Sequence, residues 1–157
     1  MCVMTRWLDA DEQQTWRAFL AASRGLMDAL DRELQRDAGM PHAYYEILVR
    51  LSETPGHSLR MSDLAEACGS SRSRLSHAVA RLEETGWVRR ENCATDRRGQ
   101  VAVLTDEGYA VLEAAAPGHV EGVRRHLFDA LTPTQVDQLR RISEAVLGTL
   151  DVPAPSA

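Results

Sequence analysis

A run of hydroxyl, arginine and histidine side chains with no acidic residue among them lies between Ser70 and Leu82. Short hydroxyl side chains allow close approach to phosphates and base edges, and an arginine can make a bidentate contact to guanine that contributes ~1–3 kcal/mol of discrimination. A solvated helix face is the other interpretation, although such a face usually mixes acids with its bases. The run therefore predicts a surface that reads DNA, with candidate contacts at Ser70, Ser71, Arg72, Ser73, Arg74, Ser76, His77 and Arg81.

A second basic group follows at Asp96, Arg97 and Arg98, just before Gly99. We expect residues 92–99 to form the turn of a β-hairpin with these arginines at its tip. A narrow minor groove concentrates negative potential and attracts an inserted arginine, and Asp96 could pair with Arg98 and hold it extended. The alternative is a solvated turn with a surface ion pair.

The charge distribution favours a nucleic-acid partner although the chain as a whole is acidic. Its formal net charge is −5, and all 18 of its basic residues are arginine. The window from Ser70 to Gln100 holds seven arginines against four acids and carries +3, which leaves −8 for the remainder. A basic island on an acidic body is the expected electrostatic footprint of a DNA-binding protein.

Two short helices must present the first basic run, and two strands the second. The pattern predicts helices over 63–68 and 72–85, followed by strands over 87–91 and 100–104. The expected cap and turn residues are Ser62, Gly69, Ser70 or Ser71, and Gly86. The residues expected on the inner faces of the two helices are Leu64, Ala65, Cys68, Leu75, Ala78, Val79 and Leu82. This order predicts a helix-turn-helix followed by a β-wing.

Further helices are expected on both sides of this unit. Spacings of three and four between apolar residues predict one long helix from Asp9 to Asp37, weakened at Gly25, and another that ends at Leu150. Their apolar stripes need burial, and paired half-sites need a two-fold axis, so we expect a homodimer; an intramolecular bundle is the alternative. Shorter helices are expected over 44–51, 106–115 and 119–131, and a break at Pro117-Gly118 separates the last two. The helix that ends at Leu150 is expected to start at Thr132-Pro133, with Gln135 completing its cap.

The chain resembles the MarR family of bacterial winged-helix transcription regulators from about Asp9 to Leu150. The resemblance rests on LAEACGSSRSRLSHAVARLEETGWVRR and on DRRGQVAVLTDEG, in which Asp96 and Arg98 match the family's wing pair. It implies a mainly α (α+β) fold with 72–85 as the recognition helix. It also implies a homodimer that binds a pseudo-palindromic operator, mostly as a repressor, and that is released by a phenolic or other aromatic effector.

The expected organisation is a single domain of this family over residues 1–157. Residues 9–54 and 106–150 form its helical dimerisation region, 58–104 its winged helix-turn-helix, and 151–157 a disordered tail. The effector site of such proteins lies between the dimerisation and DNA-binding regions. Candidate effector-binding residues are Trp16, His42, Tyr44, Tyr45 and Arg50, although core packing explains the aromatic side chains equally well.

Redox and metal sensing are alternatives within the same class. Cys2, Cys68 and Cys93 form no CxxC pair, which favours a reduced cytosolic setting. Cys93 lies in the wing beside arginines that could lower its pKa. The histidines form no tight ligand cluster, so we expect neither a metal nor another cofactor; they include His57, His77, His119 and His126.

The sequence gives little support to other classes of protein. There is no glycine-rich phosphate loop, GxSxG or HExxH motif, so we expect no enzyme. The N-terminal residues do not form a signal peptide and no apolar run reaches the length of a membrane span, which predicts a cytoplasmic protein. A winged helix used as a protein-interaction module remains the second functional hypothesis, which the outward arginines at 72, 74 and 98 argue against.

Overall fold

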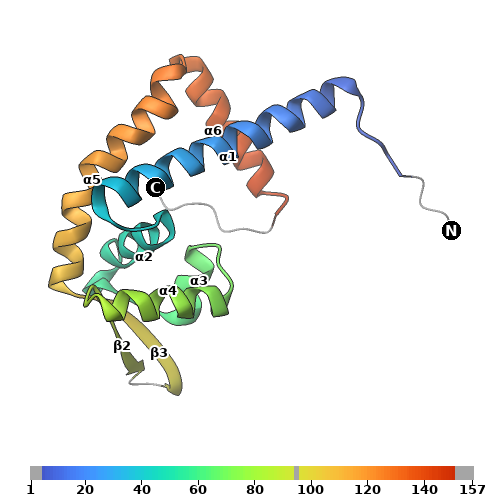
Figure 1. The fold of residues 1–157 in the computed structure, drawn as a ribbon. Helices are drawn as coiled ribbons and strands as arrows, with labels where there is room; N and C mark the ends of the chain where they lie inside the picture. The colour runs from blue at the N-terminus through green and yellow to red at the C-terminus, as the bar shows by residue number, and fades with distance from the viewer. Residues whose placement is uncertain (1–4, 94–95, 151–157) are drawn as a thin grey trace.

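The computed structural model describes residues 5–93 and 96–150, and for residues 96–98 it describes the backbone alone. Figure 1 shows the helix-turn-helix and its hairpin at one end of the molecule, the long first helix and the sixth helix at the other, and the fifth helix running between the two ends. The elements are α1 (Ala10–Ala38), α2 (His42–Ser52), η1 (Pro55–His57), β1 (Ser58–Arg60), α3 (Met61–Ala67), α4 (Arg72–Glu84), β2 (Val88–Cys93), β3 (Asp96–Leu104), α5 (Asp106–His126), η2 (Phe128–Ala130) and α6 (Pro133–Leu147).

The three strands form an antiparallel sheet in the order β1-β3-β2. Ser58 of β1 pairs with Val103, and Val88 of β2 pairs with Leu104, so β3 lies between the other two strands. The hairpin is longer than the sequence predicts: the expected turn over 92–99 is wrong, because β2 continues to Cys93 and β3 already starts at Asp96. The register of β2 against β3 is irregular between Asn92 and Cys93, and pairing continues after it, where Cys93 pairs with Asp96.

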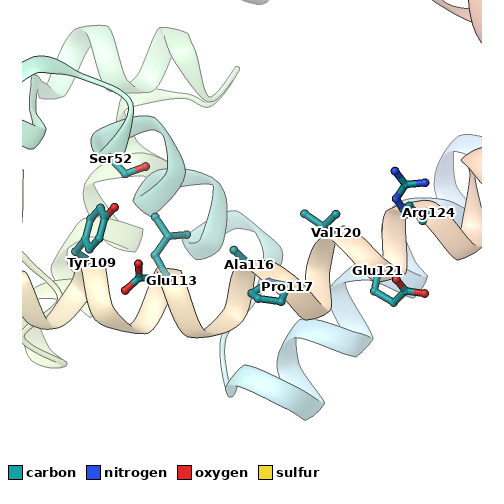
Figure 2. Close-up of a pocket in the computed structure, with 9 residues that line it drawn as sticks. Ser52, Tyr109, Glu113, Ala116, Pro117, Val120, Glu121 and Arg124 are labelled. Carbon is teal, nitrogen blue, oxygen red and sulfur yellow. The ribbon is translucent and has the colours of Figure 1, made fainter.

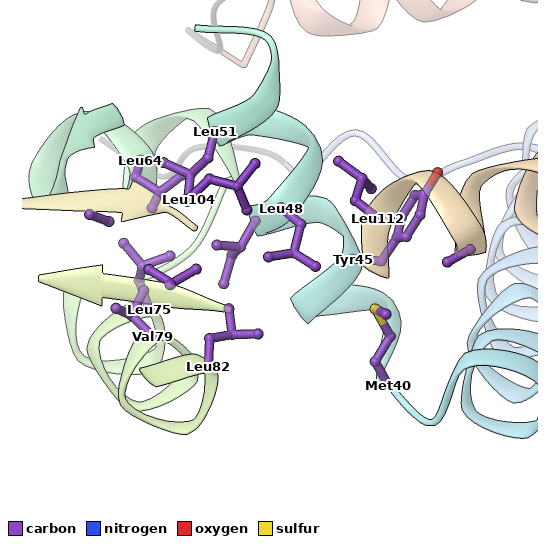
Figure 3. Packing of buried hydrophobic residues seen from close by; sticks show 14 of the residues in the cluster. Met40, Tyr45, Leu48, Leu51, Leu64, Leu75, Val79, Leu82, Leu104 and Leu112 are labelled. Atoms are coloured by element: carbon purple, nitrogen blue, oxygen red, sulfur yellow. The ribbon is translucent and has the colours of Figure 1, made fainter. Parts of the chain in front are cut away.

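One apolar core joins the helix-turn-helix to the helices around it. Leu48 and Leu51 of α2 meet side chains from α3, α4, β3 and α5, as Figure 3 shows. The inner faces predicted for α3 and α4 are largely confirmed, since all but two of the seven residues are buried. The two exceptions, Cys68 and Ala78, are half-buried and pack against the same cluster. This core fixes which face of α4 is left for solvent.

The expected break at Pro117-Gly118 is wrong, because α5 runs without interruption from Asp106 to His126. A proline inside a helix removes one hydrogen bond and costs ~3 kcal/mol. Packing on both sides of Pro117 offsets that cost: Ala115 is buried in the core, and Gly122 is buried in close contact with the Leu30 and Glu33 side chains of α1. Tertiary contact therefore overrides the local helix-breaking residues.

Capping side chains determine where some of the helices begin, but not all of them. Ser71 caps α4 and Thr132 forms a capping box with Gln135, both as predicted. Ser62 is not a cap, because α3 begins at Met61, two residues earlier than predicted, and the Ser62 hydroxyl donates to Asp63 instead. The other differences are that α1 is continuous through Gly25, α2 begins at His42, and α6 ends at Leu147 rather than Leu150.

None of the described helices is both long and apolar enough to cross a membrane. The predicted tail over 151–157 lies outside the described residues.

Candidate nucleic-acid interface

The exposed face of α4 carries the residues predicted to contact DNA. Leu75, Val79 and Leu82 bury the opposite face, and the Ser71 hydroxyl accepts from the backbone N–H of Arg74 at 3.3 Å, which starts the helix. Ser70 is half-buried in the turn before it. The remaining predicted residues all have exposed side chains: Ser71, Arg72, Ser73, Arg74, Ser76, His77 and Arg81.

The arginines on this face differ in their partners. Arg81 pairs with Glu84 at 2.9 Å, and both side chains are about two-thirds exposed. Within the described part of the chain, no carboxylate lies within ion-pair distance of Arg72 or Arg74. The first turn of α4 holds no acid either. Two guanidinium groups at the start of α4 are therefore available to an external acceptor.

The wing lies beside α4 as an extension of the sheet (Figure 1). Asp96, Arg97 and Arg98 belong to the backbone of β3 rather than to a turn, while their side chains lie outside the described residues. The expected pair between Asp96 and Arg98 therefore stays a prediction.

An ion pair that the sequence analysis missed joins α4 to the wing. The Glu83 carboxylate accepts from the backbone N–H of Arg90 at 3.0 Å and from Arg90 Nε at 2.7 Å. Each side chain is less than a third exposed. The two residues lie in different elements, on either side of the Gly86 turn, so no helix or strand pattern in the sequence brings them together. The pair ties β2 to the end of α4.

The five predicted effector residues do not form one cluster. Trp16 lies on α1 about 33 Å from its C-terminal end, given 22 residues at a 1.5 Å rise, and its ring contacts Phe19. His42 and the buried Tyr45 both lie next to the ring of His119, with centroids 5.4 and 4.4 Å from it. Tyr44 and Arg50 share neither of these neighbourhoods. Arg50 is half-buried, 3.8 Å from Glu46, and Tyr44 lies beside α4.

A groove that the sequence analysis did not identify lies between α2 and α5. It has a volume of about 490 Å³ and is lined by Ser52 of α2 and by one face of α5. Figure 2 shows these side chains, with apolar groups in the middle and Glu113 and Arg124 toward the sides. Positions 109, 112, 113, 116, 117, 120, 121 and 124 recur at helical spacing, a pattern visible only when α5 is known to be continuous.

Cys68 lies at the end of α3, and Cys93 lies in β2. Burial raises the pKa of Cys68 to about 11, helped by the nearby Glu46 carboxylate, so its thiol stays protonated at neutral pH. Cys93 is half-buried in β2, and Cys2 lies outside the described residues. Across residues 5–93 and 96–150, no group of three or more potential ligands could hold a metal ion. These observations give redox or metal sensing no structural support in the described residues.

The helices at both ends of the chain expose apolar side chains. Nothing on α6 is buried, and Ile142 is 61% exposed. On α1, Phe19 and Trp16 are more than half exposed. The larger exposed apolar residues are Trp7, Leu8, Trp16, Phe19, Met27, Tyr109, Val120, Phe128, Leu139, Ile142, Val146 and Leu150. They lie mostly on α1, α5 and α6, the helices predicted to form a dimer.

A helix-turn-helix, a two-stranded wing and an arginine-bearing second helix define a winged-helix DNA-binding protein. Comparison with known proteins agrees. The MarR family model matches residues 38–99. Sco3205, a MarR family transcriptional regulator from Streptomyces coelicolor solved in complex with DNA, is 56% identical over 97% of this chain and 93% of its own, with a TM-score of 0.91. AbsC, another MarR family regulator from that organism, is 46% identical over 94% of this chain and 99% of its own, with a TM-score of 0.88.

The chain belongs to the MarR family of transcriptional regulators. Among curated relatives, the transcriptional repressor MprA of Escherichia coli K12 is 33% identical over 114 residues. That match covers 72% of this chain but 64% of MprA, slightly less than two thirds of its length. Fold and family are thus fixed by full-length structural relatives.

Proposed function

We propose that this protein is a homodimeric, sequence-specific repressor that acts on a pseudo-palindromic operator in the bacterial cytoplasm. The observation that carries the proposal is the exposed face of α4, where Arg72 and Arg74 have no described acidic partner. In this role α4 enters the major groove and Arg98 of the wing enters the flanking minor groove. Sco3205, solved with DNA, supports the assignment. The function consists of binding and includes no enzymatic step.

The second copy is needed to cover the apolar faces of α1 and α6. A helix with no buried residue gains little from folding against its own chain, and Leu139, Ile142 and Val146 form one apolar stripe along α6. A dimer that binds two half-sites on one face of the duplex needs its two α4 helices about one turn of DNA apart, ~34–36 Å. Ile142→Glu should therefore give a monomer in sedimentation analysis and lose operator binding.

Selection of bound duplexes from a random pool, at physiological salt, tests the function. Enrichment of an inverted repeat with half-site centres one helical turn apart would establish a dimeric operator reader. A folded dimer that enriches no sequence would instead indicate a protein-interaction module and overturn the proposal.

The groove between α2 and α5 is our proposed effector site. Its volume of about 490 Å³ suits a small molecule, and it connects α2, which packs on α4, with α5, which packs on α1. An aromatic body would lie on Leu112 and Val120, with Arg124 available to an anionic group. A panel of phenols and aromatic acids should release the operator from wild-type protein. Ala116→Phe, which fills the groove, should bind DNA but no longer respond.

A further inference from the structure

Tyr44 lies outside the helix-turn-helix, yet its side chain lies beside the recognition helix. It is on the first turns of α2 and lines a surface groove of about 640 Å³ together with Arg74, His77 and Arg81 of α4. Glu84 lines the far end of the same groove and is paired with Arg81. A phenol therefore shares one groove with the basic side chains expected to contact DNA.

The ring of Tyr44 is held in place while its hydroxyl is not. The side chain is half-buried and packs against the apolar core. Among residues 5–93 and 96–150, no group is hydrogen-bonded to the Tyr44 hydroxyl. The pKa of Arg81 is raised, chiefly by the hydrogen bond and charge of Glu84 and to a smaller degree by Tyr44, which places the phenol near that guanidinium. The result is a positioned donor without a partner among the side chains that the structure describes.

The dimensions of DNA suggest what that partner is. An α-helix with its side chains is ~10–12 Å across, and the major groove is ~12 Å wide. A helix in the groove therefore meets a row of phosphates on each flank. Arg74, His77 and Arg81 recur at spacings of three and four, so they form one flank of α4, and it is the flank next to Tyr44.

We propose that Tyr44 donates a hydrogen bond to a DNA phosphate beside the flank of α4 that carries His77 and Arg81, and so extends the DNA interface from the helix-turn-helix to α2. Tyrosine hydroxyls are among the side-chain groups that bind phosphate oxygens, and such contacts fix the register of a protein on the duplex without reading its sequence. The proposal rests on the function proposed above. It makes Tyr44 a positioning residue rather than an effector ligand.

The substitution Tyr44→Phe tests this contact, because it removes the donor and keeps the ring that packs on the core. In the full chain, affinity for both the selected operator and an unrelated duplex should fall roughly threefold to tenfold, with an unchanged ratio between them. Because tyrosine is uncharged, the dependence of affinity on salt should keep its slope. Tyr45→Phe is the matched control: it removes the neighbouring phenol, which lies in the core against His119, and should bind as wild type does.

Duplexes with a single methylphosphonate locate the partner. At one position in each half-site, the difference in affinity between wild type and Tyr44→Phe should shrink or vanish, because the methyl group replaces one phosphate oxygen and removes the negative charge. Wild-type affinity of Tyr44→Phe, or a loss confined to the operator, would overturn the contact while leaving the proposed function intact. Failure of wild-type protein to bind any duplex would overturn both. Equal thermal midpoints for the variants and wild type establish that the fold is unchanged.

Discussion

Glu83 holds Arg90 with both oxygens of its carboxylate, one on the backbone N–H at 3.0 Å and one on Nε at 2.7 Å. Glu83 is at the end of α4 and Arg90 is in β2, so this one side chain joins the recognition helix to the wing. Both residues are largely shielded from solvent, which limits screening of the pair. The angle at which the wing leaves α4 is therefore set by a specific interaction rather than by the Gly86 turn alone.

Replacing Glu83 with alanine should lower the free energy of unfolding by about 1–3 kcal/mol, since a half-buried arginine and a backbone N–H lose their acceptor. Operator affinity should also fall, because the wing is no longer fixed relative to α4. Chemical denaturation and a DNA titration measure the two effects. Glu84→Ala is the matched control: its pair with Arg81 is mostly exposed, so its stability cost should stay below ~1 kcal/mol. Equal stability losses in the two variants would contradict the assignment.

The sequence was sufficient where neighbours in the chain interact. The capping box of Thr132 and Gln135, the Ser71 cap and the buried face of α4 all follow from residues a few positions apart, and all are confirmed. The expected break at Pro117 is wrong for the opposite reason, since contacts with α1, 80 or more residues away, keep α5 helical. Local rules cannot weigh such contacts.

The same limit applies to the site. The exposed residues of α4 fall within one short stretch of the sequence, so helical spacing was enough to predict them; Ser70, in the turn before the helix, is half-buried. The pair of Glu83 with Arg90 and the position of Tyr44 beside α4 depend on how separate elements pack. The groove along α5 could not be predicted, because its residues were divided between two expected helices. The effector cluster was predicted from polar and aromatic residues near the junction of the first two helices, but Trp16 lies far along α1, and only His42 and Tyr45 share a neighbourhood, beside His119.

The two unpaired arginines of α4 should contribute differently from the wing. Arg72→Ala and Arg74→Ala are expected to lower operator affinity by ~1–3 kcal/mol each and to reduce the preference for operator over other duplexes, if they contact base edges. Arg98→Ala should weaken binding and leave the dimer intact. Competition binding against single-base operator variants measures the preference. A uniform loss across all sequences would reassign Arg72 and Arg74 to phosphates.

Two glycines of α5 offer a test of its packing. A Cβ at Gly108 would lie 2.1 Å from the Trp87 carbonyl oxygen, whereas a Cβ at Gly118 would meet nothing within 4 Å. Gly108→Ala should therefore destabilise the protein by ~1–3 kcal/mol or more, because the backbone after the wing must move. Gly118→Ala should stabilise it by ~0.5–1 kcal/mol, as expected inside a regular helix. If thermal denaturation showed that Gly108→Ala is more stable than wild type, the close packing of Gly108 on the Trp87 backbone would be contradicted.

The ring of His119, packed against Tyr45 and His42, should make stability depend on pH. Burial lowers the pKa of His119 below its ordinary value of 6.5, and the positive charge of His42 acts in the same direction, while Glu33 opposes them. A lowered pKa means that the unfolded chain binds this proton more readily than the folded one. The contribution is therefore fully present above pH 6.5 and is lost as the pH falls through the window below it.

Thermal midpoints measured from about pH 7.5 down to about pH 5.5 should accordingly decrease, and His119→Phe, which keeps a ring against Tyr45, should flatten that decrease. The lowered pKa of Glu33, caused first by its hydrogen bond with His126 and also by Arg125, acts near and below its ordinary value of 4.5 and so outside this window. His77→Gln, at an exposed position of α4, should keep the wild-type dependence. If His119→Phe also kept the wild-type dependence of the thermal midpoint on pH, a group other than His119 would have to cause that dependence.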